Sequence, residues 1–207
     1  MKNIARILLC FMIFLLVGCE NKEVLSQQEN LINNYFTYLK ENNLEEISKI
    51  SSDTVLVSFL EDINEEIEYY NDVEYFGEDF VKSAKNYYNY LAEYYIDSYQ
   101  IKEIKKEDKD KYEAYVDVMV RDYSTLIAGA YNLDELADSY MERSSAEIEN
   151  ILKTEGEDAA RHSVYKAVAQ MSFAILSNNV KSIEPEKVTI RMVLSKENDN
   201  WKILYFT

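Results

Sequence analysis

Glycine, proline, cysteine and histidine are all scarce in this chain, and each shortage excludes a kind of protein. Four glycines and one proline among 207 residues argue against glycine-rich phosphate-binding loops and long disordered linkers. With no internal repeat either, we expect one domain. The only cysteines, Cys10 and Cys19, both lie near the N-terminus, so no disulfide framework is expected and stability must come from an apolar core.

The single histidine, His162, follows Arg161. One histidine without a cysteine or a second histidine beside it cannot form a usual zinc site. A Ser-His-Asp triad would need His162 as its base, and the chain has no G-x-S-x-G motif to expose a serine. We therefore expect a surface or helix-end histidine, and predict no catalytic residue, metal site or cofactor. An acid–base pair of carboxylates and tyrosine stays open, because 38 carboxylates offer too many choices.

Basic residues are few: 22 Lys and Arg stand against 38 Asp and Glu, a net charge of −16. Without Lys2 and Arg6 the balance is 20 against 38, or −18. Such a surface repels phosphate backbones, so we predict no nucleic-acid partner. It also repels anionic lipid headgroups, so the domain is expected to stand away from a membrane.

The densest acidic stretch, Glu61 to Asp79, holds nine carboxylates and no basic residue. A weak divalent-cation site is one interpretation. No D-x-D-x-D-G spacing appears, however, so a solvated helix face is favoured. For the same reason we interpret Asp108-Lys109-Asp110 as a turn.

The N-terminus has the order of an export signal. Lys2 and Arg6 provide positive charge, and residues 7–17 form a run of 11 apolar residues. That run is too short to span a membrane, which needs roughly 20 residues. Charge, apolar run and a small residue, Gly18, in this order are typical of a secretory signal peptide.

The residues Leu16-Val17-Gly18-Cys19 resemble the lipobox of bacterial lipoproteins. The resemblance implies that residues 1–18 are a cleaved signal peptide, and that the Cys19 thiol is alkylated by a diacylglyceryl group whose acyl chains are of the palmitate type. Cys19 is then the lipid attachment site, and the protein lies on the outer face of the cell membrane. Plain secretion is the alternative; Gly18 fits its cleavage rule, but Leu16 does not. Residues 19–26 are expected to form a polar tether.

The remaining residues, 27–207, are predicted to form one α+β domain. Helical spacing of apolar residues begins at Gln27, recurs over 44–50, is mixed over 54–71 and is clear over 78–95. A short strand at 99–104 leads into the charged run 105–111, which we interpret as a hairpin turn.

Strict alternation over residues 112–121 predicts a strand with one buried face. A long helical region over 126–180 follows, with Ala160, Val164, Ala167, Val168, Met171 and Ile175 on its buried face. A second hairpin, 188–206, turns at 197–200 and closes the chain. The expected fold therefore has N-terminal helices packed on a curved antiparallel sheet of two hairpins, with a long helical insertion between the hairpins.

The helices of Leu31 to Ile50 and the closing pattern Lys187 to Leu194 with Asn200-Trp201-Lys202-Ile203 resemble the nuclear-transport-factor-two-like (cystatin-like) cone fold. With the lipobox, this is similar to secreted lipoproteins of Gram-positive bacteria of uncharacterised function. The resemblance implies a curved sheet around N-terminal helices and a pocket at the open end. The helical insertion departs from the simple cone, and is expected to cover the sheet or fill the pocket.

Eighteen tyrosines are present, nine of them between Tyr69 and Tyr99. Core positions are the favoured interpretation, and a recognition surface is the alternative. For function, we expect a lipid-anchored, non-catalytic module that binds an envelope protein, peptide or glycan. The alternative is a small-molecule enzyme or carrier with a pocket lined by Tyr115, Trp201 or their neighbours and a buried carboxylate.

Overall fold

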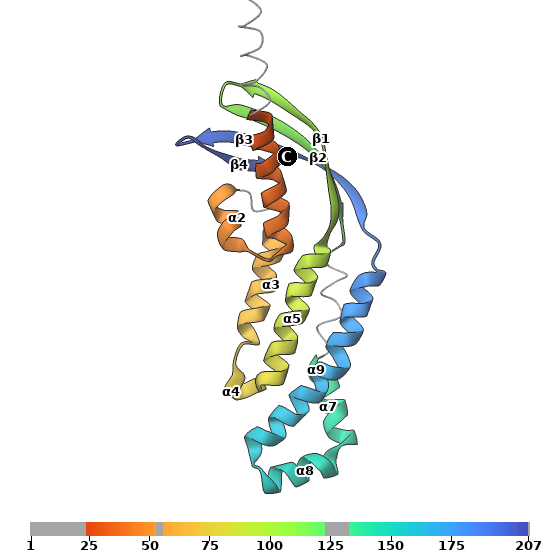
Figure 1. Ribbon diagram of the computed structural model, residues 1–207. Helices are drawn as coiled ribbons and strands as arrows, with labels where there is room; N and C mark the ends of the chain where they lie inside the picture. The colour runs from red at the N-terminus through yellow and green to blue at the C-terminus, as the bar shows by residue number, and fades with distance from the viewer. Residues whose placement is uncertain (1–23, 53–55, 123–132, 207) are drawn as a thin grey trace, which may run out of the picture.

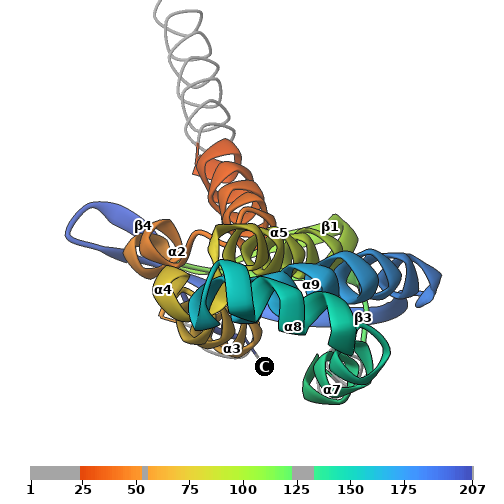
Figure 2. The same cartoon turned by 90° about the horizontal axis from the view of Figure 1, so that it is seen from below.

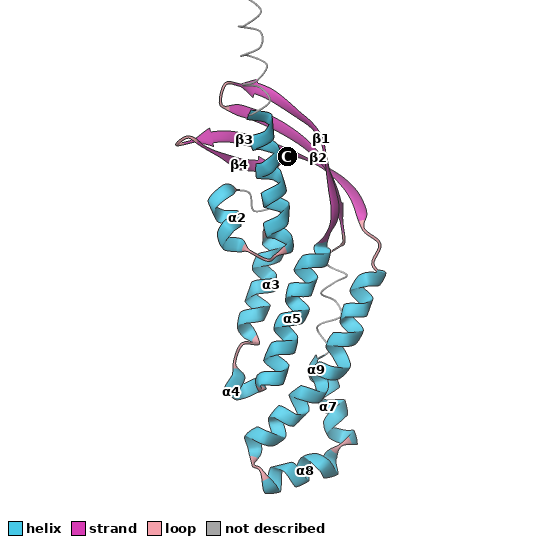
Figure 3. Cartoon of the chain, viewed as in Figure 1, coloured by secondary structure: helices cyan, strands magenta, loops and turns pink. Residues whose placement is uncertain are grey.

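The computed structural model describes residues 24–52, 56–122 and 133–206. The described chain is elongated, with an open four-stranded antiparallel sheet at one end and helices at the other (Figure 1). Figure 3 shows the strands at one end of this axis with the N-terminal helices beside them, and the remaining helices beyond the sheet. The predicted α+β class is confirmed. The predicted signal peptide and the lipid attachment site Cys19 lie outside the described residues.

Residues 24–40 form the first helix, which includes residues 24–26 of the predicted tether. Its inner face packs on the sheet, because the Phe36 ring stacks on Tyr99 at 4.2 Å and the Tyr35 ring meets Phe206 edge-on at 5.5 Å. α2 (Leu44–Ile50) follows, capped by the Asn43 side chain, which accepts a hydrogen bond from the backbone N–H of Glu46. The helical spacing predicted for this region is confirmed.

The sheet has the order β1-β2-β3-β4, and each neighbouring pair is antiparallel. Its strands are β1 (Ile96–Asp108), β2 (Lys111–Val120), β3 (Glu186–Glu197) and β4 (Asn200–Phe206). The alternation predicted for β2 is confirmed, since Ala114 and Val116 are fully buried. Glu113 is buried as well, although it belongs to the other face, because the Arg191 side chain covers and pairs with it.

The first turn lies where the sequence predicts it, at Asp108-Lys109-Asp110, but the wider turn predicted over residues 105–111 is too long. β1 continues to Asp108, and only Lys109 and Asp110 form the turn. β1 is an edge strand, and charged side chains suit an exposed edge because they oppose pairing with other chains. The second turn falls within the predicted residues; Asn198 and Asp199 both have positive φ, 48° and 66°, as a two-residue hairpin turn requires.

Six helices beyond the sheet form what we call the helical arm. They are α3 (Ser58–Tyr69), α4 (Val73–Phe76), α5 (Glu78–Tyr95), α7 (Leu133–Arg143), α8 (Ser145–Thr154) and α9 (Glu157–Ser182). α5 has the bounds that its spacing predicts, and its stripe of Phe80, Ala84, Leu91 and neighbouring tyrosines is buried. α9 runs along α5, while α3 packs on another side of α5 (Figures 1 and 2).

The helices α7, α8 and α9 do not cover the sheet, which corrects the expectation for this insertion. α9 packs on α5 and α4 beyond the end of the sheet, and α7 and α8 pack on α9. The predicted buried face of α9 is correct at Ala160, Val164 and Val168 but wrong at Ile175, which is 61% exposed. Apolar residues surround the helix over residues 171–176, so periodicity alone does not indicate which side is buried. Residues 126–132 of this prediction lie outside the described part.

The side chain of Arg121 connects the sheet to the arm. Its guanidinium donates to the carbonyl of Tyr94 at 2.8 Å, to the carbonyl of Ile183 at 2.9 Å and to the Asp97 carboxylate at 2.8 Å. These groups lie near the end of α5, after the end of α9 and in β1. Arg121 itself is only 7% exposed, whereas the Asp97 side chain is 43% exposed, so the guanidinium is buried but its carboxylate partner reaches water.

We expect the Arg121→Met substitution to lower the free energy of unfolding by about 2–3 kcal/mol, because it leaves the carbonyls of Tyr94 and Ile183 without their donor. Arg143→Met is the matched control, since the Arg143 side chain is exposed and bonds to one carbonyl, that of Ser139. Its cost should stay within about 0.5 kcal/mol. Urea unfolding measures both, and equal costs would contradict the role given to Arg121.

Candidate functional site

The structure does not bring Tyr115 and Trp201 together. Tyr115 lies on the outer face of the sheet, where Lys105 sits 5.2 Å from its ring. Trp201 contacts Tyr112 edge-on at 5.4 Å, and Tyr112 belongs to the opposite face of β2. Between the sheet and the first helix lie the fully buried side chains of Tyr35 and Phe36. Tyr115 and Trp201 therefore do not line a common pocket there.

His162 connects α9 to α4. Its Nε2 lies 2.8 Å from the carbonyl oxygen of Glu74, and since a carbonyl only accepts, Nε2 carries the proton. The ring packs against Gly77, where an added Cβ would lie 3.0 Å from its Cγ. Next to it, Arg161 donates to the carbonyl of Tyr75 at 2.9 Å. These contacts hold the start of α9 on α4, which is a structural task.

A cleft of about 400 Å³ opens beside His162 at the far end of the arm. Its walls are apolar at Phe76 and Phe80, and polar at Ser163, Lys166 and Asp79. Lys166 pairs with Asp79 at 2.6 Å, and this hydrogen bond holds the pKa of the Asp79 carboxyl below its usual value. The cleft is thus amphipathic, with its lysine already engaged.

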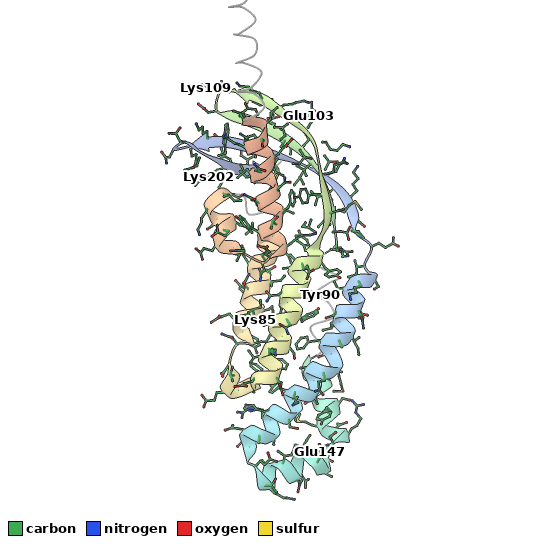
Figure 4. All side chains as sticks on the ribbon, viewed as in Figure 1. Lys85, Tyr90, Glu103, Lys109, Glu147 and Lys202 are labelled. Atoms are coloured by element: carbon green, nitrogen blue, oxygen red, sulfur yellow. The ribbon has the colours of Figure 1, made fainter. Side chains whose placement is uncertain are left out.

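A second, wider groove of about 810 Å³ lies between the first helix and α5. It is lined by Thr37, Lys40, Glu41, Asn86, Asn89, Tyr90 and Glu93. The side-chain amide of Asn42 bonds to two other amides: it accepts a hydrogen bond from Asn64 at 2.8 Å and donates one to Asn89 at 3.2 Å. Figure 4 places Tyr90 midway along the molecule. The amides serve mainly to hold α3, α5 and the end of the first helix together.

The nine tyrosines from Tyr69 to Tyr99 divide into a core group and a surface group. Tyr87, Tyr88 and Tyr95 are at least nine-tenths buried. Burial raises the pKa of Tyr87 to about 12, and burial together with Glu66 raises that of Tyr88. Tyr69 and Tyr75, in contrast, are 69% and 46% exposed. The core interpretation is therefore confirmed for the first group, whereas Tyr69 and Tyr75 lie at the surface.

Tyr69, Tyr75 and Val73 form one exposed apolar surface, which we call the tip patch. Val73 is 45% exposed. The three residues come from the end of α3 and from α4, in the half of the molecule away from the β1–β2 turn, where α8 extends farther out (Figure 1). Periodicity and composition do not predict this patch. The one signal in the sequence is that the acidic stretch 61–79 and the tyrosine-rich stretch 69–99 overlap there.

The acidic stretch itself does not gather around one point. It runs through α3, α4 and the start of α5. Within it, Asp72 caps α4 by accepting from the N–H of Tyr75 at 3.0 Å, and Asp79 pairs with Lys166. Among the residues that the structure describes, no group of three or more His, Cys, Asp or Glu side chains is placed to hold a metal ion.

The outer face of the sheet carries ion pairs instead. Asp117 lies 2.7 Å from Lys187 and accepts from the Thr189 hydroxyl at 2.7 Å. The Lys187 and Thr189 hydrogen bonds lower the pKa of Asp117, in that order of size. Likewise, the hydrogen bond from Arg191 lowers the pKa of Glu113. These carboxylates are engaged within the sheet and are not poised as general bases.

Comparison with protein-family models, curated proteins and solved structures finds no match for this chain. Within the described ranges, no helix is both long and apolar enough to cross a membrane. A function for the chain must therefore be inferred from its own residues and geometry.

Gly77→Ala should destabilise the protein more than Gly156→Ala. Both glycines have positive φ, +81° and +98°, in a region that costs a side chain about 1–3 kcal/mol. A Cβ at Gly156 meets no atom within 4 Å, whereas one at Gly77 meets the His162 ring. The extra cost should be about 1–3 kcal/mol and should be smaller in a His162→Ala background, which removes the ring but keeps the Cβ at 3.2 Å. Urea unfolding of the double-mutant cycle measures it, and additive costs would contradict the contact.

Asp117→Asn should flatten the acid dependence of stability. The pKa of Asp117 is lower in the folded than in the unfolded chain, where it is about 3.9. The stabilisation it gives is therefore complete above that pH, and is lost as the pH falls through the folded-state value. Unfolding free energies measured from about pH 5 to about pH 2.5 test this. If Asp117→Asn and Lys187→Gln both keep the wild-type slope, the ion pair does not contribute.

Proposed function

We propose that this chain is an exported lipoprotein, anchored through a lipid on Cys19 to the outer face of the cell membrane, whose domain is a non-catalytic interaction module of the envelope. The observation that carries the proposal is the sequence Leu16-Val17-Gly18-Cys19 after a short apolar run. Two or more acyl chains on Cys19 would give a lasting anchor, whereas one chain gives only marginal binding.

The placement of the two ends of the domain supports this proposal. The described chain begins at Val24, five residues after Cys19, at the sheet end of the molecule (Figure 1). Figure 4 shows Lys109, in the β1–β2 turn, and Glu147, on α8, at opposite ends. An anchor at Cys19 therefore leaves the helical arm free to point away from the lipid.

Charge is distributed along the same axis. The sheet segments 96–121 and 186–206 contain ten basic and ten acidic residues, so they are neutral overall. The arm segments 58–95 and 133–182 contain 19 acidic and 7 basic residues. Anionic headgroups repel the arm but not the sheet. This difference favours an orientation with the sheet near the membrane and the arm extended outward.

We further propose that the sheet and first helix are a form of the nuclear-transport-factor-two-like cone, with the arm as its insertion. In support, β1–β2 and β3–β4 are two hairpins whose inner face packs on the first helix through Phe36 and Tyr35. A small-molecule carrier or enzyme is the second candidate. The amphipathic cleft beside His162 at the arm's end favours it.

Cys19→Ser should abolish membrane attachment, and Cys10→Ser is its matched control in the same leader. In the producing bacterium, wild type and Cys10→Ser should incorporate labelled palmitate and sediment with membranes. Cys19→Ser should remain unlabelled and leave the membrane fraction, because the thiol that accepts the lipid is gone. Palmitate labelling of the Cys19→Ser chain would refute the assignment.

A further inference from the structure

We propose that the tip patch, Tyr69, Val73 and Tyr75, docks a cationic segment of another protein, rich in arginine or lysine. The inference rests on the proposed function, because an anchor at Cys19 places this patch in the membrane-distal half of the molecule. The lipobox does not indicate a partner, and the tip patch adds the chemistry that such a partner would have.

The tip patch exposes rings that are held rigidly from behind. The buried ring of Phe76 lies between them, 6.3 Å from Tyr69 and 4.9 Å from Tyr75. Tyr70 contacts both Tyr69 and Phe76, at 4.9 Å and 5.5 Å. Rings fixed in this way lose little conformational freedom on binding, which favours their use as contact residues. Few other large apolar side chains are as exposed as Tyr69.

Carboxylates surround the tip patch. Glu65, Glu68 and Glu74 are exposed, and none of them forms an ion pair with a cationic side chain of the described residues. The nearby cations pair with other carboxylates: Arg161, which touches the edge of the patch, pairs with Asp158 at 2.6 Å, and Lys166 pairs with Asp79 at 2.6 Å. The surface therefore exposes aromatic rings beside three carboxylates that have no ion-pair partner among the described residues. A cationic partner is complementary both to the rings and to the negative charge.

The molecule already binds one guanidinium at the edge of this patch. Arg161 lies 4.8 Å from the Tyr75 ring centroid and donates to the carbonyls of Tyr75 and Glu74. Tyr75 nevertheless remains 46% exposed. This contact shows that a ring of the patch can hold a guanidinium, and the exposed ring of Tyr69 with the carboxylates of Glu68 and Glu74 offers the same ring and carboxylate chemistry to an incoming arginine. A neutral glycan would not require the carboxylates, so a cationic peptide is the better fit.

Flotation of vesicles tests the inference and separates it from the proposed anchor. The lipidated full-length product is reconstituted into pure phosphatidylcholine vesicles, which are neutral, and mixed with a fluorescent peptide of alternating arginine and glycine. The protein and the peptide should float together with the vesicles. Tyr69→Ser combined with Tyr75→Ser should weaken peptide capture about tenfold, as loss of two contact rings would, while the protein still floats.

Two control variants separate the patch from general acidity. Tyr205→Ser removes a tyrosine that is 41% exposed on β4, at the other end of the molecule, and should leave capture unchanged. Glu68→Gln with Glu74→Gln should weaken capture more than Glu29→Gln with Glu186→Gln, which removes the same charge elsewhere on the exposed surface. Unchanged unfolding temperatures show that each variant is folded.

Each outcome is decisive. A wild-type protein that does not float with the vesicles refutes the proposed anchor and leaves the patch to be judged by peptide binding in solution. A floating protein that captures no arginine peptide, or captures it equally well without Tyr69 and Tyr75, overturns the inference. Capture of a fluorescent N-acetylglucosamine oligosaccharide in place of the peptide, lost with the same two tyrosines, would assign the patch to glycan instead.

Discussion

The guanidinium of Arg121 is the group on which the relation between sheet and arm depends. α5 passes into β1 without a loop, and α9 reaches β3 through three residues. The last carbonyls of a helix have no partner within it. Arg121 donates hydrogen bonds to one carbonyl near the end of α5 and to one just after α9. Arg121 directly follows β2. Its buried side chain therefore fixes the direction in which both long helices leave the sheet.

The arm needs its own core, because it extends beyond the sheet. Aromatic rings supply it: Phe80 packs at 5.2 Å on Phe76 and at 5.7 Å on Phe173, while Tyr87 packs at 5.3 Å on Phe173. The same cluster reaches the surface at Tyr69 and Tyr75. The abundance of tyrosine thus has a common physical origin in the core and at the tip, since tyrosine is apolar in its ring and tolerates water at its hydroxyl.

The two ends of the domain are suited to different surroundings. The sheet end is neutral and adjoins the proposed anchor, while the arm is acidic and ends in exposed aromatic rings. Repulsion between lipid headgroups and the acidic arm would then keep the arm away from the membrane. The rings of the tip patch would thereby be presented to soluble or neighbouring proteins. The cleft beside His162 adjoins this tip, so a second ligand would bind close to the same region.

Periodicity by itself determined much of the fold. The alternation of β2, the helical stripe of α5 and the α+β order follow from local spacing, which the backbone geometry imposes regardless of context. Local spacing failed at residues 105–108, where charged side chains belong to an edge strand, and at Ile175, where apolar residues surround the helix. In both cases the environment of the side chain depends on which other segment packs there.

The lipobox and the charge balance also came from the sequence, because each is a property of residue order or count. Only the tertiary structure decided that Tyr115 and Trp201 lie on opposite faces, that His162 connects α9 to α4, and that Tyr69 and Tyr75 are exposed. All three of these findings depend on contacts between segments that are far apart in the chain. Such contacts arise only when the helices pack, and spacing within one segment does not contain them.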